Sequence, residues 1–211
     1  MSWKVISFYT EDYKDEVATL IKSLDMLKLP YDIECVKSKG NWKKNTFQKI
    51  PYIVKKLKQY NHPLLWLDAD AEVIQYPVLI DSIGDALMAG VYTPLKSHEF
   101  VSNTMYFVPS KEVFEYLRET NKFIEELPNA YDTRCVGEQY YMQVVLEANR
   151  WKERLRFKEL PYSYAMPSYW KTCQYRSLCK DDYVIKQRQA SRRKNPDKRD
   201  FYKRLGLSVV D

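Results

Sequence analysis

The chain has 211 residues, of which 45% are hydrophobic and 29% charged, and its formal net charge is +6. This composition fits one globular domain with a substantial core, and only 5 glycines argue against long flexible linkers. No apolar run is long enough to span a bilayer and the chain starts without a signal-peptide pattern. We therefore expect no membrane span and a cytoplasmic location.

The cysteines and histidines exclude one further class of site. Four cysteines occur without a Cys-x-x-Cys pair, and the chain has only 2 histidines. A structural zinc ion needs four clustered sulfur or nitrogen ligands, so a zinc site is not expected.

The first 60 residues predict a strand, a helix and a second strand. Residues 4–10 form an apolar run, the acids Glu11 and Asp12 favour the start of a helix that ends before Pro30, and residues 31–36 are again strand-like. A polar, basic loop over 37–46 then leads into a helix that ends near Tyr60. This order is typical of nucleotide-binding α/β sheets, and the basic loop is either an anion site or simply solvated.

The most informative stretch is the sequence LLWLDADAEVI, which spans residues 64–74. Four apolar residues in a row predict a strand buried on both faces, and ligands of α/β sheets bind beyond such strand ends. Extended backbone would place Asp68 and Asp70 on one side, about 6.6 Å apart along the strand. Two carboxylates at this spacing suit Mn²⁺ or Mg²⁺. The alternative is a strand that ends in a solvated, Asp-rich turn.

The rest of the chain alternates strands and helices. We expect a short helix or turn after Pro77, strands over 86–92, 100–108 and 155–160, and helices over 110–127 and 138–148. The predicted fold class is therefore α/β, with a mostly parallel mixed sheet flanked by helices.

The C-terminal part of the chain is aromatic and then strongly basic. Residues 186–204 contain nine Lys and Arg against two Asp, a net charge of +7. Such a block is either solvated or binds the phosphates of a nucleotide or a nucleic acid. We expect one domain over 1–185 and a basic segment over 186–211 that packs on or near the active-site cleft expected beyond the strand ends.

The order of elements and the Leu-Trp-Leu-Asp-Ala-Asp context resemble the Asp-x-Asp motif of GT-A glycosyltransferases, most of all a compact bacterial and phage group. Three segments fit the resemblance and extend it over roughly residues 4–165: Asn41–Lys49, Ser102–Phe107 and Gly137–Gln139. The family uses the motif to hold a metal that bridges the diphosphate of a nucleotide-sugar. The resemblance therefore implies a Rossmann-like GT-A fold and a nucleotide-sugar donor, with UDP-sugars favoured.

The resemblance also implies roles for individual residues. Asp70 is the expected direct metal ligand, and Asp68 is a second ligand or a ribose contact. Glu138 is a candidate for the sugar contact or the base that activates the acceptor, although an acid at a helix N-terminus is often only stabilising. The other donor-binding candidates are Thr10, Asn45, Lys49, Asn103, Gln139, Arg192, Arg193 and Lys194. The acceptor candidates are Tyr169 and Trp170, which are otherwise core aromatics.

One feature departs from the family pattern. Many metal-dependent members add a C-terminal histidine as a further ligand, whereas residues 184–194 contain none. Either the metal relies on Asp70 and water with Asp68 in support, or cations such as Arg192 and Lys194 share the charge of the diphosphate.

The sequence leaves the acceptor open. The expected reaction moves a sugar from the donor to a hydroxyl group of a glycan, a protein, a small molecule or a hydroxymethylated pyrimidine in phage DNA. The basic segment and the aromatics suit DNA, because phosphates attract Lys and Arg and a flipped base stacks on rings. The competing hypothesis is a non-catalytic module that binds nucleic acid or nucleotide.

Overall fold

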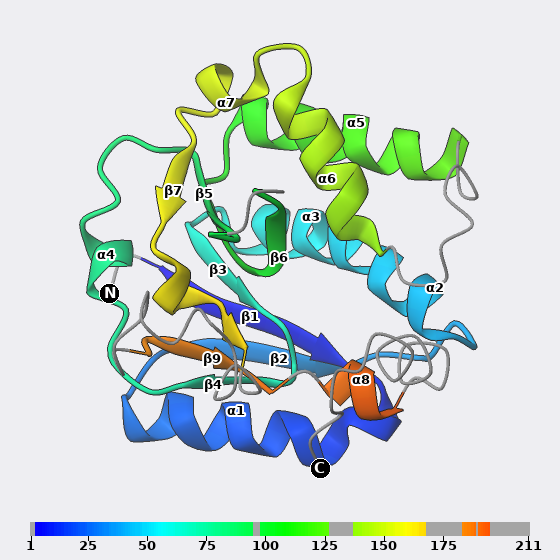
Figure 1. The fold of residues 1–211 in the computed structure, drawn as a ribbon, viewed down its shortest axis with the longest axis vertical. Helices are drawn as coiled ribbons and strands as arrows, with labels where there is room; N and C mark the ends of the chain where they lie inside the picture. The colour runs from blue at the N-terminus through cyan, green and yellow to red at the C-terminus, as the bar shows by residue number, and fades with distance from the viewer. Residues whose placement is uncertain (1–2, 95–97, 127–136, 168–182, 189, 195–211) are drawn as a thin grey trace.

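The computed structural model describes residues 3–94, 98–126, 137–167, 183–188 and 190–194. Its centre is a six-stranded sheet (Figure 1). In spatial order the strands are β2 (Tyr31–Cys35), β1 (Lys4–Tyr9), β3 (Leu64–Leu67), β6 (Phe100–Phe107), β5 (Met88–Tyr92) and β7 (Lys158–Leu160). Strand β6 runs antiparallel to β3 and β5, and the other three pairs are parallel. The predicted mostly parallel mixed sheet is confirmed.

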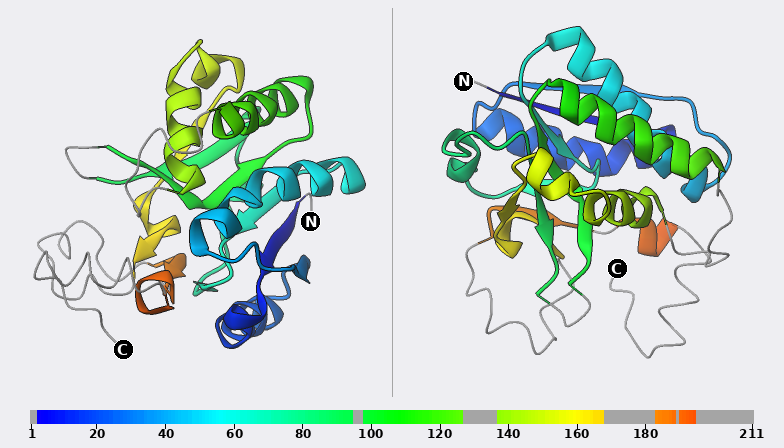
Figure 2. Two further views of the ribbon diagram at one scale, coloured as in Figure 1. Left: turned by 90° about the vertical axis from the view of Figure 1, so that its right-hand side faces the viewer. Right: turned by 90° about the horizontal axis from the view of Figure 1, so that it is seen from above.

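Helices cover both faces of this sheet, as Figure 2 shows. One face carries α3 (Lys49–Tyr60), α5 (Lys111–Glu126) and α6 (Glu138–Glu147), and the other carries α1 (Lys14–Met26). Strand β3 has core on both sides, because Leu64 and Trp66 join the first cluster while Leu65 and Leu67 join the second. All four side chains are at most 1% exposed, so the expected doubly buried strand is present.

A second, three-stranded sheet joins the C-terminal part of the described chain to the middle. Its strands are β4 (Ala71–Val73), β9 (Ile185–Gln187) and β8 (Met166–Pro167), with β9 in the centre. Strand β9 is antiparallel to β4, and Ala71 lies opposite Gln187. The short helix α8 (Ala190–Lys194) follows. The predicted boundary between residues 185 and 186 therefore falls inside a strand.

The structure differs from the sequence prediction in three places. Residues 69 and 70 form a turn, where extended backbone was expected between Asp68 and Asp70. Residues 42–47 of the expected loop form helix α2 (Trp42–Phe47), because the side chain of Asn41 accepts a hydrogen bond from the backbone N–H of Lys44 and caps the helix. The strand expected over 155–160 is shorter. Its first residues follow the one-turn helix α7 (Trp151–Arg154), and only Lys158–Leu160 pairs with β5.

The remaining short elements are η1 (Glu11–Tyr13), α4 (Val78–Asp81) and η2 (Tyr162–Tyr164). Within the described residues, no helix is long and apolar enough to cross a membrane.

Candidate active site

The acidic turn leaves the main sheet at the C-terminal end of β3. Its first carboxylate, Asp68, donates its backbone N–H to the carbonyl of Asn103 on β6 over 3.0 Å. The carbonyl of Asp68 accepts from the N–H of Ala71 over 2.9 Å, which closes the turn and directs the chain into β4. Both acids therefore lie where the main sheet meets the small one, beyond the end of a parallel strand.

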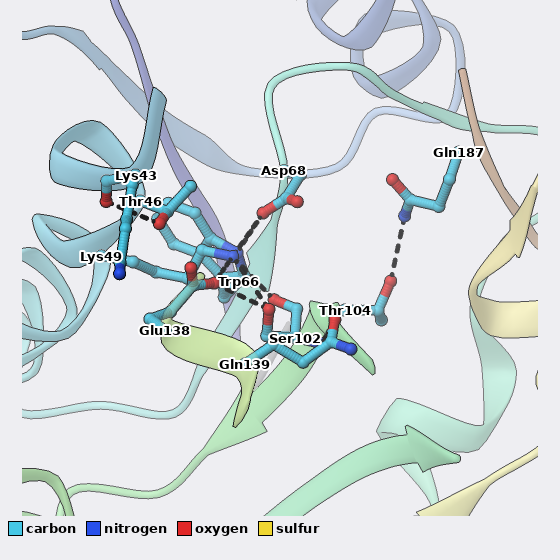
Figure 3. Close-up of polar contacts among 10 residues, drawn as sticks. All are labelled: Lys43, Thr46, Lys49, Trp66, Asp68, Ser102, Thr104, Glu138, Gln139 and Gln187. Carbon is cyan, nitrogen blue, oxygen red and sulfur yellow. Dashed lines mark hydrogen bonds and ion pairs between the residues drawn. The ribbon is translucent and has the colours of Figure 1, made fainter. Parts of the chain in front are cut away.

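A buried ion pair borders the turn on one side (Figure 3). Lys49, from the first turn of α3, pairs with Glu138 at the start of α6, and both residues are at most 4% exposed. The ammonium also donates to the carbonyl of Ser102 over 3.1 Å, and the Ser102 hydroxyl donates to Glu138 over 2.7 Å. Three elements far apart in the sequence meet here, and each charged group has a partner.

These contacts hold both residues in their charged forms. Burial alone would lower the pKa of Lys49, but the carboxylates of Asp68 and Glu138 outweigh it and the pKa is raised. Burial alone would raise the pKa of Glu138, but the charge and hydrogen bond of Lys49, together with the Ser102 hydroxyl, lower it. The carboxylate of Glu138 is thus a weak base, and it already pairs with Lys49 and accepts a hydrogen bond from Ser102.

Asp68 connects this ion pair to solvent. Its Oδ1 lies 2.8 Å from the ammonium of Lys49 and accepts from the indole N–H of Trp66 over 2.9 Å. The side chain is still 32% exposed. One edge of the carboxylate is therefore fixed by the protein while the group as a whole remains accessible.

Asp70 has a different environment, because the C-terminal segment covers it. Its Oδ2 accepts from the backbone N–H of Ala190 over 2.6 Å, and its carbonyl accepts from the N–H of Arg188 over 3.0 Å. The residue is 9% exposed. Among the side chains that the structure describes, which do not include those of Arg192 and Arg193, no cation pairs with it. Burial, followed by the nearby charges of Asp68 and Glu16, raises the pKa of Asp70 to about 6.

The C-terminal segment is fixed by Glu16 of α1. Its Oε2 lies 3.1 Å from the guanidinium of Arg188, and its Oε1 lies 3.9 Å from the ammonium of Lys194. Lys194 also lies 4.9 Å from the ring of Tyr13 and donates to the carbonyl of Asp12. The Lys194 predicted for the diphosphate is thus held at the start of α1. Arg192 and Arg193 belong to α8, and their side chains lie outside what the structure describes.

The other predicted donor contacts are spread along the same edge. Thr10 follows β1, the parallel neighbour of β3, and its hydroxyl donates to Asp12. Asn45 accepts from the backbone N–H of Lys39 over 2.7 Å and so closes the basic loop on itself. Gln139 accepts from the backbone N–H of Ser102 over 3.4 Å. The acceptor candidates Tyr169 and Trp170 lie outside the described residues.

The sequence analysis gave no individual role to two polar residues of this region, Gln187 and Thr104. Among the described residues, the amide oxygen of Gln187 is buried without a hydrogen-bond partner. The same holds for the amide oxygen of Asn103, a residue that was expected to contact the donor. The hydroxyl of Thr104, also missed, contacts the amide of Gln187. Ile185 and Gln187 alternate with Lys186 as residues on one face of a strand would, and this pattern could have predicted β9. It was overlooked because the basic segment was interpreted only by its charge.

The residues present suit a divalent cation in part. Asp70 carries a buried carboxylate that no described cation neutralises, and the accessible Asp68 lies two residues away. Unpartnered oxygens of Asn103 and Gln187 lie on the elements beside them. Among the described residues no group of three or more His, Cys, Asp or Glu side chains could hold a metal ion. A cation here would therefore complete its shell with neutral oxygens, water or a ligand.

The fold and this site define an α/β protein with an acidic turn at the edge where such sheets bind ligands. The sequence matches no protein-family model and no curated protein. Three solved structures are similar in fold. A glycosyltransferase involved in glycosylation of the major capsid of PBCV-1 aligns with a TM-score of 0.64 at 14% identity, over 94% of this chain and 98% of its own.

The second is the glycosyltransferase GlyE of Streptococcus pneumoniae TIGR4, with a TM-score of 0.62 at 13% identity. It covers 89% of this chain, which spans 54% of GlyE. The third is the galactosyltransferase LgtC in complex with donor and acceptor sugar analogs, with a TM-score of 0.54 at 10% identity over 99% and 97% of the two chains. The chain therefore has the fold of these glycosyltransferases, the GT-A fold.

Proposed function

We propose that the protein is a metal-dependent glycosyltransferase that moves a sugar from a nucleotide-diphosphate sugar, a UDP-sugar above all, to a hydroxyl acceptor. The observation that carries this proposal is the acidic turn of Asp68 and Asp70 at the ligand-binding edge of a GT-A fold. Burial and the nearby charge of Asp68 make the carboxylate of Asp70 costly to keep charged, and a bound cation would offset this cost.

In this proposal Asp68 and Asp70 hold Mn²⁺ or Mg²⁺, both of which prefer oxygen ligands. Bound there, the cation supplies Lewis-acid stabilisation for the charge that develops on the departing diphosphate. Asp70 is the more committed ligand, because the backbone N–H of Ala190 fixes its carboxylate. Asp68 keeps an accessible edge that can bind the cation or the ribose.

Lys49 and Glu138 bind and orient the donor in this proposal. Glu138 is 2% exposed and pairs with Lys49, and its lowered pKa makes it a poor proton acceptor near neutral pH. Of the two roles expected for Glu138, the contact to sugar hydroxyls is therefore the better supported. Thr10, Asn45, Asn103 and Gln139 remain candidates for the donor, as do Arg192, Arg193 and Lys194.

The acceptor is the least constrained part of the proposal. A hydroxymethylated pyrimidine in DNA is favoured by one observation, the net charge of +7 over residues 186–204. Glycans, proteins and small molecules are the alternative acceptors. A non-catalytic module that binds nucleotide or nucleic acid is the alternative function, and in that case the acids would not affect binding.

The test is a turnover assay with a panel of nucleotide-sugars and Mn²⁺, in which release of the nucleotide diphosphate is followed by mass spectrometry. We expect one donor to be hydrolysed slowly, and Asp70→Asn to lower the rate by about 10²–10³-fold. Asp85→Asn, at a side chain that is 87% exposed, is the matched control. DNA with hydroxymethylated pyrimidines, unmodified DNA and glycans are then compared as acceptors.

The proposal fails if no donor turns over with any acceptor or metal. It also fails if Asp70→Asn keeps full activity.

A further inference from the structure

Gln187 is a buried polar side chain whose hydrogen bonding is incomplete. It lies on β9, is 1% exposed, and donates through its amide nitrogen to the hydroxyl of Thr104 over 3.3 Å. Its amide oxygen is buried and has no hydrogen-bond partner within the part of the chain that the structure describes. Buried amide oxygens are normally paired, since each one left without a partner costs free energy. Burial of the Gln187 amide oxygen therefore costs free energy unless a further group binds it.

The orientation of the amide follows from its neighbour. The hydroxyl of Thr104 has one proton, which it donates to the carbonyl of Tyr164 over 2.7 Å. That hydroxyl can only accept from Gln187, so the NH₂ group must face Thr104. Turning the amide over would place two acceptors against each other. The oxygen therefore faces away from Thr104.

The strands place this oxygen next to the acidic turn. Gln187 lies opposite Ala71, the residue after Asp70, and the N–H of the following Arg188 donates to the carbonyl of Asp70. Thr104 lies opposite Leu67, the residue before Asp68. The hydrogen bond from Gln187 to Thr104 thus joins β9 to β6, the strands that pair with β4 and β3 on either side of the turn. In Figure 3 its oxygen is turned to the side on which Asp68 lies.

We propose that the amide oxygen of Gln187 is a neutral ligand of the divalent cation held by Asp68 and Asp70. This inference rests on the proposed function and supplies the ligand that the absence of a histidine over 184–194 left open. The elements that meet at the turn bring several acceptors: the carboxylates of Asp68 and Asp70, and the oxygens of Gln187 and Asn103, which have no partner among the described residues. The one cation described beside these carboxylates is Lys49, which pairs with Asp68. A divalent cation satisfies several of these acceptors at once, whereas a sugar hydroxyl would satisfy one.

A carbonyl oxygen also determines which cations fit. Hard cations such as Mg²⁺ and Mn²⁺ prefer oxygen, whereas imidazole suits zinc and other later transition metals. With two carboxylates and a neutral amide, the ligand charge balances one divalent cation. We therefore expect Gln187→His to move the preference of the site toward Co²⁺ and Zn²⁺.

The experiment is a titration of the protein with Mn²⁺, with and without UDP, in which free Mn²⁺ is measured by electron paramagnetic resonance. Gln187→Met removes the oxygen at similar volume, Gln187→Glu replaces it with a charged oxygen, and Gln75→Met makes the first change at an exposed position. We expect Gln187→Met to raise the Kd for Mn²⁺ at least ~10-fold, as losses around metal sites do. Gln187→Glu should lower this Kd, and Gln75→Met should leave it unchanged.

The melting temperature without metal separates a ligand from a structural residue. Gln187→Met removes a buried oxygen that has no partner among the described residues and also one long hydrogen bond to Thr104, two changes that oppose each other in stability. Its melting temperature should therefore stay close to that of the wild type while it binds Mn²⁺ more weakly. If it melts lower and its Kd for Mn²⁺ is unchanged, Gln187 is structural and the inference is overturned.

Three further outcomes also decide against the inference. If only Asp70→Asn abolishes Mn²⁺ binding and Gln187→Met binds as the wild type does, the metal site stands without Gln187. If Gln187→Met weakens UDP-sugar binding equally in the absence of Mn²⁺, the oxygen serves the donor. If the wild type binds no Mn²⁺ with or without UDP, the metal in the proposed function and the role of Gln187 fail together.

Discussion

The two halves of the site solve the problem of buried charge in opposite ways. On the side of α3 and α6, Lys49 pairs with both Glu138 and Asp68, and Ser102 adds a hydrogen bond to Glu138. On the side of the small sheet, Asp70 has backbone donors but no cation among the described residues. In the first half each charged group has a partner, whereas in the second the carboxylate of Asp70 has no cation among the described side chains. We call them the complete and the incomplete half.

This contrast indicates where a ligand contributes most. A buried charge without a partner lowers the free energy of unfolding. Proteins commonly retain such destabilising groups where they bind a ligand. The complete half positions groups, whereas the incomplete half is where a cation would bind. Substitutions in the two halves should therefore have opposite effects on stability.

The largest expected effect on stability follows from removing the ammonium group of Lys49 in the complete half. Lys49→Met leaves Glu138 charged, buried and unpaired, and should lower the free energy of unfolding by about 3–5 kcal/mol. Urea denaturation measures this change. Adding Glu138→Gln to Lys49→Met should recover part of the loss, because the uncompensated charge is removed.

Lys14→Met is the control for the loss of a lysine as such. Lys14 forms an exposed pair with Glu11, and its loss should cost less than about 1 kcal/mol. A Lys49→Met protein as stable as Lys14→Met would mean that the complete half contributes no more than a surface pair.

In the incomplete half, removing a charge should stabilise the metal-free protein. The folded-state pKa of Asp70 is about 6, above its ordinary value of 3.8, so the folded protein binds the extra proton between these values. The contribution of Asp70 to wild-type stability should therefore fall as pH rises from about 4 to 6, and then level off. Asp70→Asn lacks this loss and should gain up to about 3 kcal/mol over the wild type at pH 7.

Thermal melts from pH 4 to 8 without metal measure this difference, and Mn²⁺ should reverse it. Asp85→Asn should keep a constant offset from the wild type across the same range. If the Asp70→Asn protein also keeps a constant offset, then Asp70 is not destabilised by its surroundings.

The smallest expected effect concerns the contact that keeps the C-terminal segment over Asp70. Glu16→Gln removes the charge that faces Arg188 and Lys194, and because both cations are partly exposed the local cost should be about 1 kcal/mol. Hydrogen exchange should quicken several-fold at residues 185–194, including the N–H of Ala190.

Glu11→Gln, which loses only an exposed pair, is the matched control and should leave this exchange unchanged. Equal exchange in the two variants would show that Glu16 does not hold the segment.

The sequence was sufficient for the elements whose signals are local. The four apolar residues of β3 and the helical periodicity of α1 and α3 appear where they were predicted, since burial on one or two faces leaves a direct pattern. Helix α2 was missed because its residues are polar and basic, although Asn41 at its start was a usable capping signal.

The partners within the site were beyond the reach of the sequence. Nothing local indicates that Lys49 meets Glu138, 89 positions later, or that Gln187 lies across from Ala71. Those contacts depend on how the strands are ordered in the two sheets. The charge of the C-terminal segment also concealed its first residues, which form a strand of the small sheet.

The most direct test of the central claim is the thermal stability of the wild type with UDP, Mn²⁺ or both, compared with Asp68→Asn and Asp70→Asn. A ligand that binds only the folded protein raises the Tm, and at a given concentration a tighter ligand raises it more. We predict a clear rise with UDP and Mn²⁺ together, a small one with either alone, and none with both in the Asp70→Asn protein. An equal rise with UDP alone in all three proteins would contradict a metal-dependent donor site at the acidic turn.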